Sequence, residues 1–153
     1  MANTYSQIYI QVVFAVKYWE TLIKDKYRVE LEKYITGIVK NNNSKLLAIY
    51  CNPDHTHVLI GLNPDVSVSE ISCNIKANSS RWINQNKWYK GTFRWQTGFG
   101  VFSYSRSQID YIAKYILNQQ EHHRRTSFKD EYLDLLNKAE IKYDEEYIFD
   151  WIE

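Results

Sequence analysis

Two histidines, His55 and His57, stand two positions apart inside an apolar stretch. Side chains on a β-strand alternate between its faces, so residues two apart project the same way. On a strand the two imidazoles would lie together, roughly 6–7 Å apart at the backbone, and could bind one metal ion. Two hydrogen-bonded histidines without a metal give the same pattern, so the pair alone is a weak signal. A catalytic metal would also need a third protein ligand and open positions for substrate.

A second group of candidate site residues lies in residues 110–125, whose pattern predicts a helix. Residues four apart share one helix face, so Tyr115 and Gln119 would project side by side, with Tyr111 one turn earlier. The amide oxygen of Gln119 could be the missing metal ligand, and the phenol of Tyr115 could stand beside the same ion. The pattern also fits a tyrosine that only packs, because the chain contains 13 tyrosines.

The charges are distributed unevenly along the chain. A net charge of +1 argues against coating duplex DNA by bulk electrostatics. Residues 71–109 contain no acidic residue, whereas residues 127–153 contain nine acidic residues and three lysines. A basic segment interleaved with aromatic residues suits single-stranded nucleic acid, because cations track phosphates and rings stack on bases; such rings are also common in cores. The candidate DNA contacts are Lys76, Arg81, Lys87, Lys90, Arg94 and Trp95.

The apolar patterns predict one domain in which strands and helices alternate. The predicted strands cover residues 5–16, 46–51, 55–62 and 99–105. The predicted helices cover residues 67–84, which open on a capping pattern at Ser67, and residues 25–40, 108–124 and 128–139. This order matches the ferredoxin-like pattern. It predicts an α+β fold whose antiparallel sheet carries helices on one face, contacted by Thr56, Val58 and Ile60, and is free on the other.

Other sequence features bear on location. The chain has no apolar run of the 18 or so residues that a membrane span needs. Its start lacks a basic flank leading into an apolar stretch, so no signal peptide is expected. Cys51 and Cys73 are therefore expected to be reduced, buried thiols in a cytoplasmic protein.

Further motifs follow the histidine pair in a fixed order. They are Ser67-Val68-Ser69, Lys76 with Ser79-Ser80-Arg81, Phe93-Arg94-Trp95-Gln96-Thr97-Gly98-Phe99-Gly100, Phe102-Ser103-Tyr104-Ser105, Tyr115-Ile116-Leu117-Asn118-Gln119-Gln120-Glu121-His122-His123 and Phe128-Lys129-Asp130-Glu131. From about residue 5 to residue 143, this series resembles the HUH-type single-tyrosine transposases of insertion sequences of the 200/605 type, the IS200-like transposase family.

The resemblance implies a ferredoxin-like, RNA-recognition-motif-like core with a C-terminal tyrosine-bearing helix. It places Tyr115 at the nucleophile and His55, His57 and Gln119 at the ligands of a divalent metal, Mg²⁺ or Mn²⁺. Such enzymes are typically homodimers that bind hairpins in single-stranded DNA. They cleave and rejoin the DNA at the ends of the element through a 5′-phosphotyrosine intermediate. The expected core covers about residues 5–125, and an acidic helical tail covers about 127–153.

One position departs from the family pattern, because Thr56 stands where a bulky apolar residue is usual. The paired His122 and His123 could serve the site or face DNA, but their position before two arginines favours a solvated helix end. Three alternatives share these motifs in whole or in part. They are an HUH endonuclease that initiates replication or conjugal transfer (a relaxase), a non-catalytic hairpin-DNA-binding module, and a host-domesticated relative that processes repeated hairpins.

Overall fold

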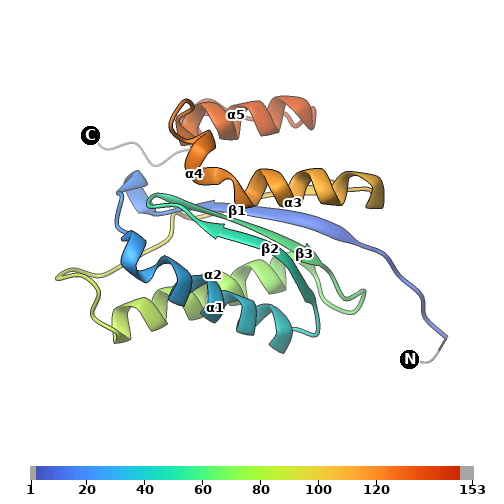
Figure 1. Ribbon diagram of the computed structural model, residues 1–153, viewed down its shortest axis with the longest axis horizontal. Coiled ribbons are helices and arrows are strands. Elements are labelled where there is room, and N and C mark those ends of the chain that lie inside the picture. Colours follow the sequence, from blue (N-terminus) through green and yellow to red (C-terminus); the bar gives the residue numbers. More distant parts are fainter. Residues whose placement is uncertain (1–2, 149–153) are drawn as a thin grey trace.

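The computed structural model describes residues 3–148, and it is built around a four-stranded antiparallel sheet (Figure 1). The strands are β1 (Tyr9–Ala15), β2 (Lys45–Cys51), β3 (His55–Gly61) and β4 (Gly100–Tyr104). They lie in the order β2-β3-β1-β4, and each neighbouring pair is antiparallel. This arrangement confirms the predicted α+β, ferredoxin-like class. The last residues of the expected acidic tail, 149–153, lie outside the described part.

Helices cover both faces of the sheet. Long helices α1 (Asp25–Asn41) and α2 (Val68–Gln85) lie on one face, and α3 (Ile109–Leu117), α4 (Gln119–His122) and α5 (Phe128–Lys138) lie on the other (Figure 1). Shorter helical turns are η1 (Lys17–Trp19), η2 (Arg106–Gln108) and α6 (Glu145–Ile148). Within residues 3–148, none of the helices has the length and apolar character that crossing a bilayer demands.

The prediction that the second face is free is therefore wrong. Its physical reason lies in the strands, which carry apolar side chains on both faces. Val13 and Phe102 pack against Phe128 and Leu136 of α5, while Leu59 belongs to a cluster with α3 residues. A sheet with two apolar faces must be covered on both to keep that surface from water.

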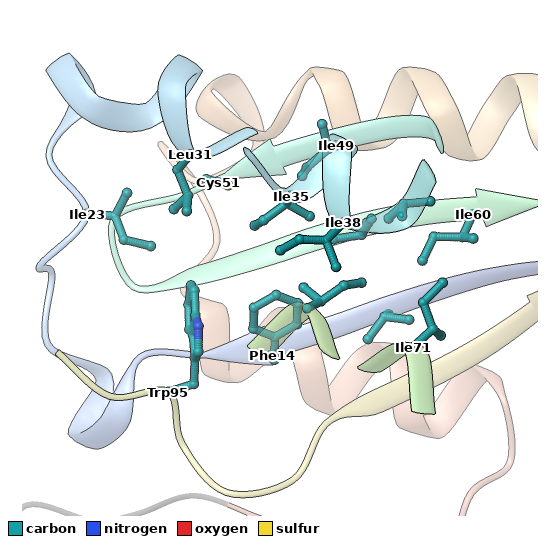
Figure 2. Close-up of a cluster of buried hydrophobic side chains, with 14 of the residues drawn as sticks. Phe14, Ile23, Leu31, Ile35, Ile38, Ile49, Cys51, Ile60, Ile71 and Trp95 are labelled. Carbon is teal, nitrogen blue, oxygen red and sulfur yellow. The ribbon is translucent and has the colours of Figure 1, made fainter. Parts of the chain in front are cut away.

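The larger core lies between the sheet and the pair α1 and α2. Figure 2 shows Phe14 and Ile60 from the strands pointing toward Ile35 and Ile38 of α1 and Ile71 of α2. Thr56, Val58 and Ile60 are fully buried, and the last two belong to this core, so the predicted orientation of β3 is confirmed. Cys51 is buried as expected, but the same expectation is wrong for Cys73, which lies on an exposed position of α2.

The ends of the strands and helices are set by the residues that hydrogen-bond to them. The first strand begins at Tyr9, four residues later than predicted, because Tyr9 is where pairing starts with both Gly61 and Tyr104. Upstream of it, Tyr5 is 92% exposed. The predicted cap of α2 is present, since the Ser67 hydroxyl accepts a hydrogen bond of 3.0 Å from the Glu70 amide.

The single helix predicted over residues 108–124 is instead two helices. The break falls at Asn118, whose backbone leaves the helical region at φ −99° and ψ 21°. Asparagine tolerates this conformation well because its side chain competes with the helical hydrogen bonds. The break turns α4 away from the axis of α3, and this redirects every side chain from Gln119 onward.

The core on the α1 side provides a test of the fold. Ile35→Ala should lower the free energy of unfolding by about 2–5 kcal/mol, because Ile35 is fully buried and the truncation leaves a cavity. Val29→Ala on the same helix, where the side chain is 47% exposed, should change it by less than about 0.5 kcal/mol. Urea unfolding followed by circular dichroism measures both. Equal effects would contradict the assignment of this helix face to the core.

Candidate catalytic and metal-binding site

His55 and His57 lie on the face of β3 that α3 and α5 cover. Both side chains are buried, and their ring centroids are 5.1 Å apart. Their backbones pair with Ala15 and Val13 of β1, which fixes both rings on a central strand of the sheet. The structure therefore brings the pair together on one face, as the alternation of side chains predicts.

Each ring of the pair is held at Nδ1 by an oxygen acceptor. His55 Nδ1 lies 2.6 Å from Asp54 Oδ1, and His57 Nδ1 lies 2.7 Å from Gln11 Oε1. The Gln11 amide nitrogen donates to the Tyr104 hydroxyl at 2.7 Å, which leaves its oxygen for His57. Both Nδ1 atoms therefore carry the hydrogen, and a neutral ring then has its lone pair on Nε2.

A buried carboxylate lies where these Nε2 atoms meet. Glu131 of α5 is 3% exposed, and its Oε1 is 3.2 Å from His55 Nε2, 3.0 Å from His57 Nε2 and 3.1 Å from His123 Nε2. Histidines 55, 57 and 123 and Glu131 place one ligand atom each within 4.8 Å of one another. These four residues, which we call the His₃Glu cluster, could hold a metal ion.

The phenol of Tyr115 meets the second oxygen of the same carboxylate. Its O–H donates to Glu131 Oε2, and His122 Nε2 lies 3.5 Å from the phenol oxygen. Burial and the Glu131 carboxylate raise the pKa of Tyr115 above its usual value. The phenol is therefore protonated in this arrangement, and its O–H is directed at the Glu131 carboxylate.

Burial and neighbouring groups shift the pKa values of the cluster in opposite directions. Burial alone would raise the pKa of Glu131, but its contacts with His123, His55 and His57 outweigh burial and hold the pKa of the carboxyl far below its usual range. Burial lowers the pKa of His57, so its ring favours the neutral form. Burial also acts to lower the pKa of His55, but Asp54 and Glu131 raise it more. The site thus holds an anion that requires positive charge beside it.

Gln119, the predicted third ligand, reaches the cluster from α4 and not from the helix that carries Tyr115. It is fully buried. Its amide nitrogen donates to Glu131 Oε2 at 3.1 Å, and its oxygen accepts from the Asn52 amide at 3.1 Å. The same oxygen lies 2.9 Å from His123 Nε2. Gln119 is therefore hydrogen-bonded to two partners and adjoins the cluster at His123.

An open groove of about 810 Å³ runs beside Tyr115 along α3 and α4. Tyr111, which is 72% exposed, lines it together with Lys114 and Arg125. The groove, which Glu121 also lines, therefore combines an exposed aromatic ring with two cationic side chains next to the half-buried phenol. These groups suit a single strand, since a ring can stack on a base and cations can pair with phosphates.

The predicted DNA contacts lie in a different layer of the molecule. They belong to α2 and to the segment that follows it, and α2 and Tyr115's helix α3 lie on opposite sides of the sheet (Figure 1). The exposed members are Arg81, Lys87, Lys90 and Arg94. The structure thus separates the basic segment from the candidate nucleophile.

Two of the predicted DNA contacts are instead engaged inside the protein. Lys76 donates from Nζ to the backbone oxygens of Gln96 and Gly98, at 2.7 and 2.6 Å. Trp95 is 8% exposed, points into the core in Figure 2, and donates from its indole to Ser79 at 2.9 Å. Each side chain fastens the 91–99 segment to α2, Trp95 from a buried position and Lys76 from a half-buried one.

Sequence reasoning misses two residues of the cluster. The prediction of a solvated helix end is wrong for His123, because the break at Asn118 turns its ring inward and the Thr126 carbonyl accepts its Nδ1–H at 2.7 Å. In the sequence, Glu131 is one of several acidic residues of the predicted tail, so it does not stand out. A signal for it exists, because Glu131 falls on the same helix stripe as Phe128 and Leu135, and a carboxylate on an apolar stripe needs a partner.

Comparisons with known proteins agree with this architecture. Residues 4–119 match the profile of the family described as "Transposase IS200 like". No curated protein matches the chain. One similar solved structure is a candidate transposase from Deinococcus radiodurans R1, with 23% identity and a TM-score of 0.59, covering 76% of this chain and 94% of that one. Another is a REP-associated tyrosine transposase bound to a REP hairpin, with 17% identity and a TM-score of 0.59, covering 79% of this chain and 72% of that one. At these identities the two structures support the fold alone.

The docking of α5 provides a test of the site. Phe128 stacks on the His55 ring, with centroids 4.0 Å apart, and holds the helix that carries Glu131. Phe128→Ala should cost about 3–5 kcal/mol of stability and should speed amide hydrogen exchange in α5 more than in β1 and β3. Asn137→Ala, at an exposed position of the same helix, is the matched control. Unchanged exchange in α5 would show that this contact does not anchor the helix.

Proposed function

The chain belongs to the IS200-like transposase family, and we propose that it cleaves and rejoins single-stranded DNA with Tyr115 as nucleophile. One observation carries the proposal. The Tyr115 phenol donates to a buried carboxylate, Glu131, whose other oxygen is contacted by both His55 and His57. Nucleophile, proton acceptor and metal-ligand candidates therefore meet at a single carboxylate.

The proposed substrate is a single strand that folds into hairpins near the ends of a mobile element. Support comes from the fold, which the REP-associated transposase bound to a REP hairpin shares. We assign the hairpin to the exposed basic residues Arg81, Lys87, Lys90 and Arg94, and the strand to be cut to the groove beside Tyr115. The two functions would then use opposite sides of the sheet.

The chemistry begins with Tyr115 attacking the scissile phosphorus. A bond forms between the phenol oxygen and phosphorus, and the bond from phosphorus to the neighbouring 3′ oxygen breaks. Glu131 Oε2 accepts the phenol proton, and the leaving oxygen takes a proton from water and is released as a 3′-hydroxyl. The 5′-phosphotyrosine conserves the energy of the broken bond, so a second 3′-hydroxyl can attack it and rejoin the DNA without ATP.

A divalent cation, Mg²⁺ or Mn²⁺, belongs to this proposal. His55 and His57 fit such an ion because an acceptor at each Nδ1 places the lone pair of the neutral ring on Nε2, the atom that would coordinate it. The resemblance adds Gln119 as third ligand. When bound, the ion supplies positive charge that polarises the scissile phosphate. The homodimer implied by the resemblance and the cytoplasmic location expected from the sequence complete the proposal.

The covalent intermediate provides the direct test. Tyr115→Phe should abolish the protein–DNA adduct formed with a labelled single-stranded oligonucleotide that carries the hairpin of the element's own end, because only the phenol can form the phosphodiester. Binding of the oligonucleotide should stay close to wild type. A denaturing gel with Mn²⁺, and with EDTA in place of the metal, measures the adduct. Tyr111→Phe, one turn earlier on α3, should keep it. An adduct that persists in Tyr115→Phe would assign the nucleophile to another residue, with Tyr111 first.

The basic surface on α2 provides a separate test. Arg81→Glu should weaken binding of the hairpin oligonucleotide and lower the slope of log Kd against log salt concentration by about one or more, because a phosphate contact is lost. Lys40→Glu makes the same charge change at an exposed position near the other end of this layer. Fluorescence anisotropy over a salt series measures both variants. Identical curves for the two would remove α2 from the DNA-binding surface.

A further inference from the structure

His123 repeats the arrangement seen at His55 and His57. Its Nδ1 donates to the Thr126 backbone carbonyl at 2.7 Å, and a carbonyl oxygen can only accept. In the neutral ring the lone pair therefore lies on Nε2. That nitrogen faces Glu131 Oε1 at 3.1 Å and Gln119 Oε1 at 2.9 Å. A lone pair directed at two oxygens is repulsive unless a proton or a cation lies between them.

The contact with Glu131 Oε1 recurs at all three histidines. Each has its Nδ1 fixed by an acceptor and directs Nε2 at that oxygen, and His55 Nε2 also lies 3.2 Å from the Asn52 amide nitrogen, which can donate to it. Protons alone would resolve the conflict only by placing three imidazolium ions around one buried carboxylate, and such charges are costly to remove from water. One divalent cation resolves all three contacts at once.

The distances fit this explanation. Bonds of about 2.0–2.2 Å from a transition metal to nitrogen and oxygen require ligand atoms about 3–4 Å apart. Glu131 Oε1 lies 3.0–3.2 Å from the three Nε2 atoms. The oxygens at the three Nδ1 atoms, from Asp54, Gln11 and the Thr126 backbone, are the outer partners that orient histidine ligands in metal sites.

We propose that the His₃Glu cluster binds one transition-metal ion, with His123 and Glu131 completing the His55–His57 pair in place of Gln119. The inference rests on the proposed function and replaces the third ligand that the resemblance gives to its metal centre. Both added ligands lie beyond residue 119, where the family match ends. Three imidazoles and one carboxylate favour Zn²⁺, Co²⁺ or Mn²⁺ over Mg²⁺, which prefers oxygen ligands.

Gln119 then has a positioning role. Its amide nitrogen holds Glu131 Oε2, and its oxygen is held by Asn52. Glu131 divides its two oxygens, with Oε1 toward the histidines and Oε2 toward the Tyr115 O–H. A single carboxylate thereby links the metal centre to the nucleophile, and α5 becomes part of the active site.

Metal binding by the purified full chain, stripped with EDTA and without DNA, tests the proposal. Titration with Co²⁺, followed by visible absorption and by calorimetry, should give one ion per chain that excess Mg²⁺ does not displace. His123→Ala and Glu131→Gln should each weaken Co²⁺ binding by about tenfold or more and alter the Co²⁺ spectrum. Gln120→Ala is the matched control, because it removes an exposed side chain of α4 that is not part of the cluster, and should leave both unchanged.

Thermal melts keep the test independent of folding defects. The metal should raise the Tm of the wild-type chain, and this rise should shrink in His123→Ala even if its metal-free Tm is unchanged. Unaltered Co²⁺ affinity in both His123→Ala and Glu131→Gln would overturn the proposal. So would loss of binding in Gln119→Ala together with normal binding in His123→Ala. Tyr115→Phe should bind Co²⁺ normally, so a failure of the nucleophile assignment would be seen separately, in the adduct assay.

Discussion

A carboxylate buried away from water must be compensated by positive charge or by hydrogen bonds, because its desolvation is otherwise too costly. Glu131 is such a group, and it receives contacts from several elements at once. The histidines of β3 approach one oxygen, and Tyr115 of α3 and Gln119 of α4 approach the other. None of these elements can shift without leaving a polar group unpaired, so the arrangement of helices on this side of the sheet depends on the carboxylate.

The strand that carries the histidines serves both layers of the protein. Alternate residues of β3 face opposite sides, so Val58 and Ile60 fill the core with α1 and α2 while His55 and His57 face α5. A slip of one residue in register would exchange these sets and would bury the imidazoles in an apolar core. Pairing of β3 with strands on both of its edges fixes the register, and the apolar face thereby fixes the geometry of the chemical face.

The sheet also separates two kinds of surface. Exposed basic residues gather on α2 and the segment after it, and the groove beside Tyr115 lies on the other side (Figure 1). In the function proposed above, DNA would be recognised by charge at one surface and cut at another. The rigid sheet between them would then set the distance between a hairpin and its cleavage site.

The sequence by itself determined the fold class, the order of strands and helices and the shared face of His55 and His57. These three features depend on the spacing of apolar and polar residues along the chain, which the sequence shows directly. Tertiary structure alone decided that the second face is covered, that Trp95 and Lys76 serve the core and the 91–99 segment, and that His123 and Glu131 join the histidine pair. The covering of the second face depends on the apolar side chains that the strands carry on that face, which only helices distant in the sequence can bury. The last depends on a helix break at Asn118 and on contacts such as His57 to Glu131, 74 residues apart. No local pattern encodes the meeting of such distant side chains, because it results from how whole elements pack.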